Sequence, residues 1–254
     1  MRFESSQVAV DTTMNNSDRT WPTPNHSHAM RMSWHDLLFA HWSFEPDRVA
    51  RLLPDGIDLD TFEGKAWVGV VPFRMSNVAP RFVPSLPWMS AFPELNIRTY
   101  VTHHGKPGVW FFSLDATNPV AVRMARWLFH LRYMDAKMSL TKVDHWYQYR
   151  SLRTHRSEPS ARLIGKYRPT SEPFFASPGS LEYWLTARYC LYVSDRRGRI
   201  LRGEIDHPPW PLQQAELVLE ENTMLDWLDL EAKTPPHLLF SKDVTVKAWL
   251  NQMA

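Results

Sequence analysis

Four polar side chains alternate with apolar ones in the stretch PELNIRTYV, residues 93–101. An extended chain directs successive side chains to opposite faces, so Glu94, Asn96, Arg98 and Tyr100 are expected to share one face. A carboxyl group, an amide, a guanidinium and a phenol could together fix a small ligand, with Glu94 as acid or base and Arg98 as the anchor of a carboxylate. The pattern fits two interpretations, an ordinary solvent-exposed sheet face or the lining of a cavity.

Other chemical signatures are weak in this chain. It contains no Gly-rich phosphate loop and no HExxH, CxxC or GxSxG motif, which argues against the reaction classes that depend on them. No His, Cys, Asp or Glu cluster has metal-ligand spacing, so we expect neither a metal nor another cofactor. Six basic residues occur between Arg150 and Arg168 against the single acid Glu158, and we expect them on the solvated faces of two hairpin strands rather than in an anion site.

Composition favours a folded protein with a small-molecule partner. The chain has 254 residues, of which 44% are hydrophobic, and a formal net charge of +2. This near balance of charge does not favour nucleic acid. Cys190 is the single cysteine, which suits a reducing compartment, and no apolar run reaches the roughly 18 residues of a membrane span, so we expect a cytoplasmic protein. Association of identical chains is left open.

The pattern predicts many strands and few helices. A helix should begin at Pro46, a hairpin should turn at Glu63 and Gly64, and the proline-rich residues 74–93 should form a long loop. Asn118 and Pro119 should begin the clearest helix, over 118–131. Strands are expected over 34–44, 57–62, 66–73, 93–101, 108–116, 142–156, 161–169, 189–195, 200–207, 215–221, 237–242 and 244–250, and short helices over 179–189 and 224–228.

These elements predict one folded domain after a disordered segment. Residues 1–31 are polar and lack periodicity, so we expect a disordered N-terminal tail. Residues 32–254 contain no linker or repeat. The expected fold is a single α+β domain with a large antiparallel, barrel-like β-sheet and a few packed helices.

Six ordered blocks of the sequence resemble a known family. The chain is similar to the YqjF-like family of uncharacterised bacterial proteins (domain of unknown function 2071) over roughly residues 32–250, and more distantly to acetoacetate decarboxylase. That resemblance implies a barrel-like sheet with helices packed around it and a closed apolar pocket. The blocks are LLFAHW, LDTFEGKAWVGVVPF, PELNIRTYV, GVWFFSLDA, GSLEYWLTARYCLY and PPWPLQQAE.

The resemblance also suggests which residues line the pocket. Glu94 matches a glutamate of the decarboxylase, Arg126 matches an arginine at the start of its active-site helix, and His35 aligns loosely with an arginine that lies early in its chain. At the end of that helix, where the decarboxylase has Pro-Lys-Lys, this chain has Arg132, Tyr133 and Met134. Both lysines, including the one that forms the Schiff base, are therefore missing, and decarboxylation should not be transferred to this chain.

Lys137 lies four residues after Tyr133. If the helix continued, Lys137 would share the face of Tyr133 and offer a displaced amine, although a surface lysine is the ordinary expectation.

The sequence supports two functional hypotheses. In the first, a closed pocket holds a small carboxylate- or carbonyl-bearing molecule and performs proton transfer (dehydration, enolisation or hydrolysis) without a Schiff-base lysine. In the second, the same fold is a non-catalytic module that binds or senses a small ligand, and the polar face is a buried structural network. The catalytic residues of the first hypothesis are Glu94 and Tyr133, and its ligand-binding residues are Arg98, Asn96, Tyr100, Arg126 and His35.

Overall fold

The computed structural model describes residues 18–81, 91–118, 123, 130–195 and 197–254. Within these residues the helices are α1 (Pro46–Ala50), α4 (Leu181–Thr186) and the 3-10 helix η1 (Asp226–Leu228). No helix in this described part is long and apolar enough to cross a membrane. The strands are β1 (Met30–Phe44), β2 (Asp58–Leu59), β3 (Ala66–Pro80), β4 (Phe92–His103), β5 (Lys106–Ala116), β6 (Tyr133–Val143), β7 (Trp146–Arg153), β8 (Arg162–Pro169), β9 (Cys190–Ser194), β10 (Ile200–Asp206), β11 (Leu212–Asn222), β12 (His237–Ala248) and β13 (Gln252–Met253).

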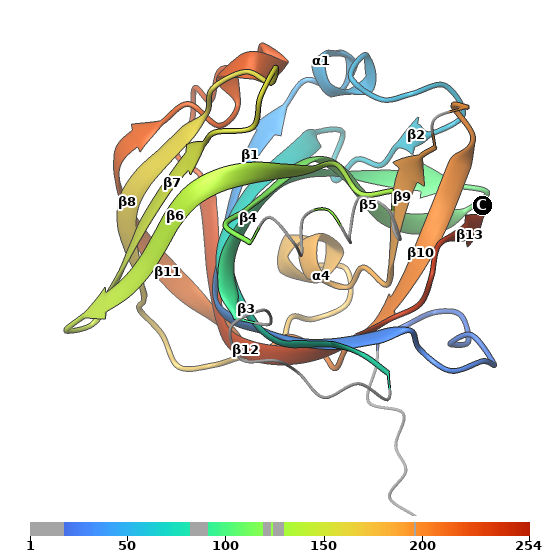
Figure 1. Cartoon of the computed structure of the whole chain (residues 1–254), viewed down its shortest axis with the longest axis horizontal. Helices are drawn as coiled ribbons and strands as arrows, with labels where there is room; N and C mark the ends of the chain where they lie inside the picture. The colour runs from blue at the N-terminus through green and yellow to red at the C-terminus, as the bar shows by residue number, and fades with distance from the viewer. Residues whose placement is uncertain (1–17, 82–90, 119–122, 124–129, 196) are drawn as a thin grey trace, which may run out of the picture.

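The strand pairings close into a barrel. Starting from β1, neighbouring strands follow in the order β3, β4, β5, β9, β10 and β12, and β12 pairs again with β1 (Figure 1). These pairings are antiparallel except for β5–β9, and β5 also pairs in parallel with β6. The α+β barrel-like fold predicted from the sequence is confirmed, with these two short parallel pairings as an addition.

A second sheet covers part of the barrel. Strands β6, β7, β8 and β11 leave the barrel beside β5 and return to it at β12, and Figure 1 shows them to one side of the barrel. An apolar core that includes Leu38, Leu95, Ile97 and Phe112 lies between the two layers. The barrel interior has its own apolar cluster, which includes Leu37, Phe39, Val71, Phe73, Leu114 and Tyr133. Because adjacent residues such as Leu37 and Leu38 belong to different clusters, the barrel wall is buried on both faces.

Several element predictions need correction. The turn at Glu63 and Gly64 is confirmed: both residues have positive φ, and Phe62 and Lys65 form an antiparallel bridge around them. The rest of the predicted hairpin is not formed, because β2 pairs with β4 and not with β3. The proline-rich segment is not a loop throughout, since β3 extends to Pro80 and pairs with both β1 and β4. Strand β6 was not predicted. Most of the helix expected over 118–131 lies outside the described residues.

The N-terminal boundary was also placed wrongly. Residues 1–17 lie outside the described part of the chain, but residues 18–29 pack on the barrel. Arg19 forms an ion pair with Glu204, whose side chain is only 5% exposed, and Trp21 Nε1 donates to the same carboxylate at 3.0 Å. Trp249 Nε1 donates to the His26 carbonyl at 2.8 Å. A buried carboxylate needs such donors, and this segment supplies them.

Candidate functional site

The polar side chains of β4, which we call the polar file (Glu94, Asn96, Arg98 and Tyr100), lie on the face toward the barrel interior. Glu94 pairs across the sheet with Phe73 and Ala116, and both partners belong to the interior cluster. Leu95 and Ile97, which alternate with the polar residues, belong to the outer core. Glu94, Asn96 and Tyr100 are 2%, 6% and 0% exposed, so the solvent-exposed interpretation of this face is wrong. The next rows across β3, β4 and β5 are Val71–Asn96–Leu114 and Gly69–Arg98–Phe111.

Glu94 is paired with Tyr133. The Tyr133 hydroxyl donates to Glu94 Oε2 at 2.9 Å, and β6 begins at Tyr133, beside Leu114 of β5. Burial raises the pKa of Glu94 to about 8 against the opposing effect of this hydrogen bond, and the nearby Asp115 raises it further. The carboxyl group is therefore largely protonated at neutral pH. In that form Glu94 can accept from Tyr133 and still donate its own proton.

Arg98 is a cation without a counter-ion among the described residues. Its guanidinium carbon lies 5.4 Å from the ring centroid of Phe39 and 5.7 Å from that of Tyr100. Its Nε is buried and has no hydrogen-bond partner, and it forms no ion pair with a described acidic residue. A guanidinium held against aromatic rings with an unused donor is suited to binding a carboxylate.

His41 and Tyr100 form a second polar pair in the interior. His41 Nε2 and the Tyr100 hydroxyl are 2.7 Å apart, and both residues are fully buried. Burial holds the pKa of His41 well below its usual range, so the imidazole is neutral. His41 Nδ1 has no hydrogen-bond partner in the described part of the chain. Nothing in the sequence indicated the contact between His41 and Tyr100.

Helix α4 and the residues that follow it contribute further side chains next to Tyr100. Trp184 lies 4.6 Å from the Tyr100 ring, centroid to centroid, and the Arg188 guanidinium lies 5.0 Å from it. Arg188 also forms an ion pair with Asp60 at 2.6 Å. Helix α4 is visible in the barrel opening in Figure 1. Nothing in the sequence around residues 181–188 linked it to β4.

The lack of a side chain at Gly69 leaves room for the His41 ring. Gly69 lies between His41 and Arg98 in the cross-strand row, and a Cβ atom at Gly69 would lie 2.6 Å from His41 Nε2. The imidazole therefore occupies the space that any other residue at position 69 would fill.

We expect Gly69→Ala to destabilise the protein by about 1–3 kcal/mol, because the methyl group overpacks a buried ring. Chemical unfolding measures the change. The double variant with His41→Ala should be more stable than the sum of the two single effects predicts, since the clash is then absent. Strict additivity would contradict this account.

The remaining predicted residues are not part of this cluster as described. His35 bonds Ser76 Oγ through Nε2 at 2.7 Å, and because the adjacent Trp34 packs with the interior cluster, His35 lies on the opposite face of β1. Arg126 lies outside the described residues. Lys137 is exposed and belongs to a strand, so the idea that it offers a displaced amine from a helix is wrong.

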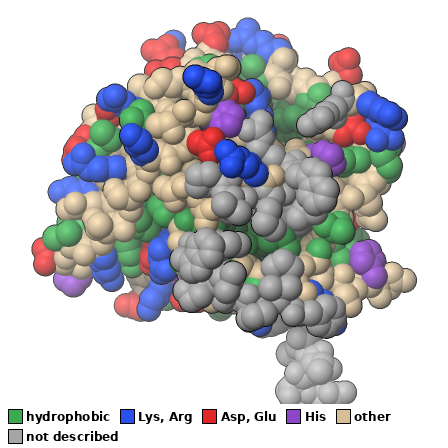
Figure 2. Space-filling view, in the orientation of Figure 1, with side chains coloured by type: hydrophobic (Ala, Val, Ile, Leu, Met, Phe, Trp, Pro, Cys, Tyr) green, Lys and Arg blue, Asp and Glu red, His purple; other side chains and the backbone are tan. Residues whose placement is uncertain are grey.

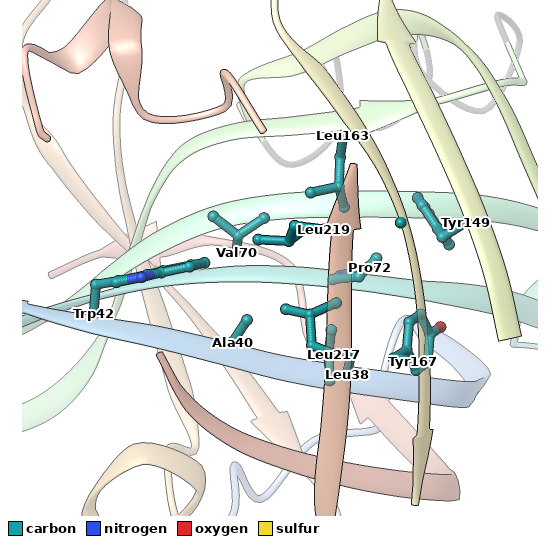
Figure 3. Close-up of a pocket in the computed structure, with 11 residues that line it drawn as sticks. Leu38, Ala40, Trp42, Val70, Pro72, Tyr149, Leu163, Tyr167, Leu217 and Leu219 are labelled. Carbon is teal, nitrogen blue, oxygen red and sulfur yellow. The ribbon is translucent and has the colours of Figure 1, made fainter. Parts of the chain in front are cut away.

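Two further cavities lie outside the barrel interior. One has a volume of about 10 Å³ and lies between the barrel and the second sheet, where apolar side chains including Leu38, Val70 and Leu217 surround it (Figure 3). It is a packing void, too small for a ligand. The other is an open depression of about 450 Å³ beside Lys142, His145 and Arg168.

On the surface, charged side chains form ion pairs or alternate with side chains of the opposite charge. Arg168 pairs with Glu216 at 2.7 Å and is partly exposed, as expected for the basic stretch, but Arg153 of the same stretch is fully buried against Asp115, so the expectation of a solvated face is wrong for Arg153. On the face in Figure 2, basic and acidic side chains are interspersed. Among the described residues, no three His, Cys, Asp or Glu side chains are grouped so that they could hold a metal ion.

Solved structures with this fold are known. The acetoacetate decarboxylase from Legionella pneumophila subsp. pneumophila str. Philadelphia 1 matches with a TM-score of 0.60 and 13% identity, covering 98% of each chain. The enduracididine biosynthesis enzyme MppR complexed with pyruvate matches with a TM-score of 0.60 and 13% identity, covering 90% of this chain and 91% of that one. At these identities the likeness concerns the fold alone.

The sequence relationship is closer to proteins without an assigned activity. The chain is 41% identical to the uncharacterized protein YqjF of Bacillus subtilis (strain 168) over 249 residues, which is 98% of this chain and 96% of YqjF. The family model DUF2071, described as an uncharacterized conserved protein, matches residues 31–245. The protein is therefore a member of the DUF2071 family, the YqjF-like proteins, on an acetoacetate-decarboxylase-like fold.

Proposed function

We propose that the barrel interior binds a small molecule with a carboxylate and a carbonyl or hydroxyl group, and that Glu94 exchanges a proton with it. The observation that carries this proposal is Arg98, which has no acidic partner among the described residues, on the same wall as a buried, protonatable Glu94. A cation partly removed from water is costly without an anion, and a bound carboxylate would supply one.

Glu94 is the acid or base in this proposal. Its pKa of about 8 allows both protonation states near neutral pH, which favours proton transfer. Tyr133 orients the carboxyl group by donating to Oε2 and leaves the other oxygen for the ligand. Enolisation or dehydration of a carbonyl or hydroxy acid needs such a group beside the carbon that gains or loses a proton.

Covalent amine catalysis is not part of the proposal. Tyr133 stands where the resemblance to the decarboxylase would place the Schiff-base lysine, and no lysine is buried in the part of the chain that the structure describes. A lysine nucleophile needs a desolvated, unprotonated amine. The MppR structure is named as a complex with pyruvate, a molecule with both a carboxylate and a carbonyl, which supports this ligand class on a barrel of the same fold.

Calorimetric titration with a panel of C3 to C5 oxo and hydroxy acids tests the binding step. We expect the wild type to bind at least one of these acids and Arg98→Met to bind it at least about 30-fold more weakly, since the ligand carboxylate would lose its cationic partner. The exposed Arg150 on β7 provides a matched control, and Arg150→Met should bind as the wild type does. Equal affinity of Arg98→Met and wild type would refute the anchor.

A separate hydrogen–deuterium exchange experiment tests the proton transfer. With a bound oxo acid in deuterated water, NMR should detect deuterium entering the carbon beside the carbonyl in the wild type. Glu94→Gln should keep the binding and lose the exchange. Unchanged exchange in Glu94→Gln would exclude Glu94 as the acid or base, whereas binding without any exchange in the wild type would favour the non-catalytic binding module.

A further inference from the structure

Asn96 lies at the centre of the polar file. It is two residues from Glu94 and two from Arg98 on the same face of β4, which places its Cα roughly 7 Å from each of theirs. A ligand whose carboxylate contacts Arg98 and whose reacting carbon lies near Glu94 must therefore pass over Asn96. The ligand group that lies over Asn96 should complement the part of the Asn96 amide that has no hydrogen-bond partner.

Asn96 lacks a donor for its carbonyl oxygen. The side chain is 6% exposed, and Oδ1 is buried without a hydrogen-bond partner among the residues that the structure describes. The residues beside it in the sheet are Val71 and Leu114, whose side chains contain no donor. Buried amide oxygens are nearly always satisfied, so Oδ1 of Asn96, on the interior face of β4, can accept a hydrogen bond from a bound molecule.

We infer that the ligand carries a hydroxyl group on the carbon chain next to its carboxylate, so that a hydroxy acid is bound in preference to the matching oxo acid. This inference rests on the proposed role of Arg98. It adds that the hydroxyl donates to Asn96 Oδ1 while the carboxylate accepts from Arg98. A ketone oxygen in the same place would set two acceptors against each other.

The electrostatics of the interior favour a hydroxyl over an ammonium group as the donor. The guanidinium groups of Arg98 and Arg188 both lie near the Tyr100 ring, and Arg188 already has Asp60 as its partner. A ligand ammonium group would lie beside these two cations. Glu94 would not offset the repulsion, because it is largely uncharged at neutral pH. A neutral donor avoids this repulsion, which distinguishes hydroxy acids from amino acids.

The test uses three acids that share a propanoate chain: 2-hydroxypropanoate, 2-oxopropanoate and 2-methoxypropanoate, each also extended by one methylene. By calorimetry or ligand-observed NMR, the hydroxy acids should bind roughly tenfold or more tightly than the oxo and methoxy acids, because only they satisfy Oδ1. Asn96→Leu keeps the size of the side chain and removes the acceptor, so its preference for hydroxy acids should disappear while Arg98 is still needed.

The outcomes separate this inference from the proposed function. If oxo or methoxy acids bind as tightly as hydroxy acids or more tightly, and Arg98→Met abolishes binding, then the hydroxyl inference is wrong and the anchor remains. If Asn96→Leu keeps the full hydroxyl preference, the inference is also wrong. If none of the acids binds, both the hydroxyl inference and the proposed function are wrong. Asn96→Ala serves as a second variant, and the thermal unfolding of both variants should match that of the wild type within a few degrees.

Discussion

Between about pH 5 and about pH 8.5, wild-type protein should lose about 4 kcal/mol more of its unfolding free energy than the Glu94→Gln variant. Burial raises the pKa of Glu94 from 4.5 to about 8 in the folded protein, so the folded state holds a proton that the unfolded chain releases. The stabilisation is complete below about pH 4.5 and is lost as the pH rises through about 8. The amide introduced by Glu94→Gln resembles the protonated acid and does not titrate.

Urea unfolding followed by tryptophan fluorescence at five or six pH values measures this difference. The two proteins should be about equally stable at the acidic end, and the variant should be the more stable one at the alkaline end. Glu172→Gln, at an exposed acid, is the control and should follow the wild-type curve. Parallel curves for wild type and Glu94→Gln would mean that Glu94 is ionised in the folded protein at neutral pH.

Arg153→Met should destabilise the protein by about 3–5 kcal/mol, because it leaves the buried Asp115 carboxylate without its counter-charge. Both side chains are 0% exposed, and Arg153 Nε lies 3.0 Å from Asp115 Oδ2. The same guanidinium donates to Ser113 Oγ at 2.8 Å. This ion pair joins β7 of the second sheet to β5 of the barrel, so its loss should weaken the contact between the two layers.

The control for this prediction is the double variant Arg153→Met with Asp115→Leu. Removing both charges avoids the isolated carboxylate, so the double variant should recover most of the stability lost in the single variant. Arg150→Met, on the same strand and exposed, should change the unfolding free energy by less than about 0.5 kcal/mol. Chemical unfolding measures all three. A double variant as unstable as Arg153→Met alone would show that lost packing, not the uncompensated charge, dominates.

The alternation in residues 93–101 was enough to predict a strand and the face that its polar residues share. It could not show whether that face is wet, because both faces of β4 are buried and only one is apolar. Burial of the outer face depends on β6, β7, β8 and β11, which lie far along the chain. The choice between the two interpretations therefore required the tertiary structure.

The contacts of His41 could not be predicted from spacing. They depend on the register of β1 against β3, which shifts between His35 and Ala40, and on the space left by Gly69. Register shifts of this kind change which residues meet across the sheet without a clear signal in composition. His35 was proposed from a loose alignment in the resemblance, and such an alignment does not indicate which face of β1 the side chain occupies.

The N-terminal tail was extended too far because polar, aperiodic composition is typical of disorder. Arg19 and Trp21 are ordered by a buried carboxylate on β10, which lies near the other end of the chain, and local composition carries no information about it. At Glu63 and Gly64 the predicted turn was right and is closed by a bridge between Phe62 and Lys65, and the error concerned the pairing partner of β2.

The burial of β4 on both faces has a consequence for molecular recognition. A strand held between two packed layers has no room to shift toward a ligand, so the spacing of Glu94, Asn96 and Arg98 is preorganised before any ligand arrives. Selectivity then arises from a rigid template, and discrimination between similar acids comes from mismatched groups rather than from induced fit. Related chains could change their ligand by exchanging one side chain on this strand while the barrel that supports it stays the same.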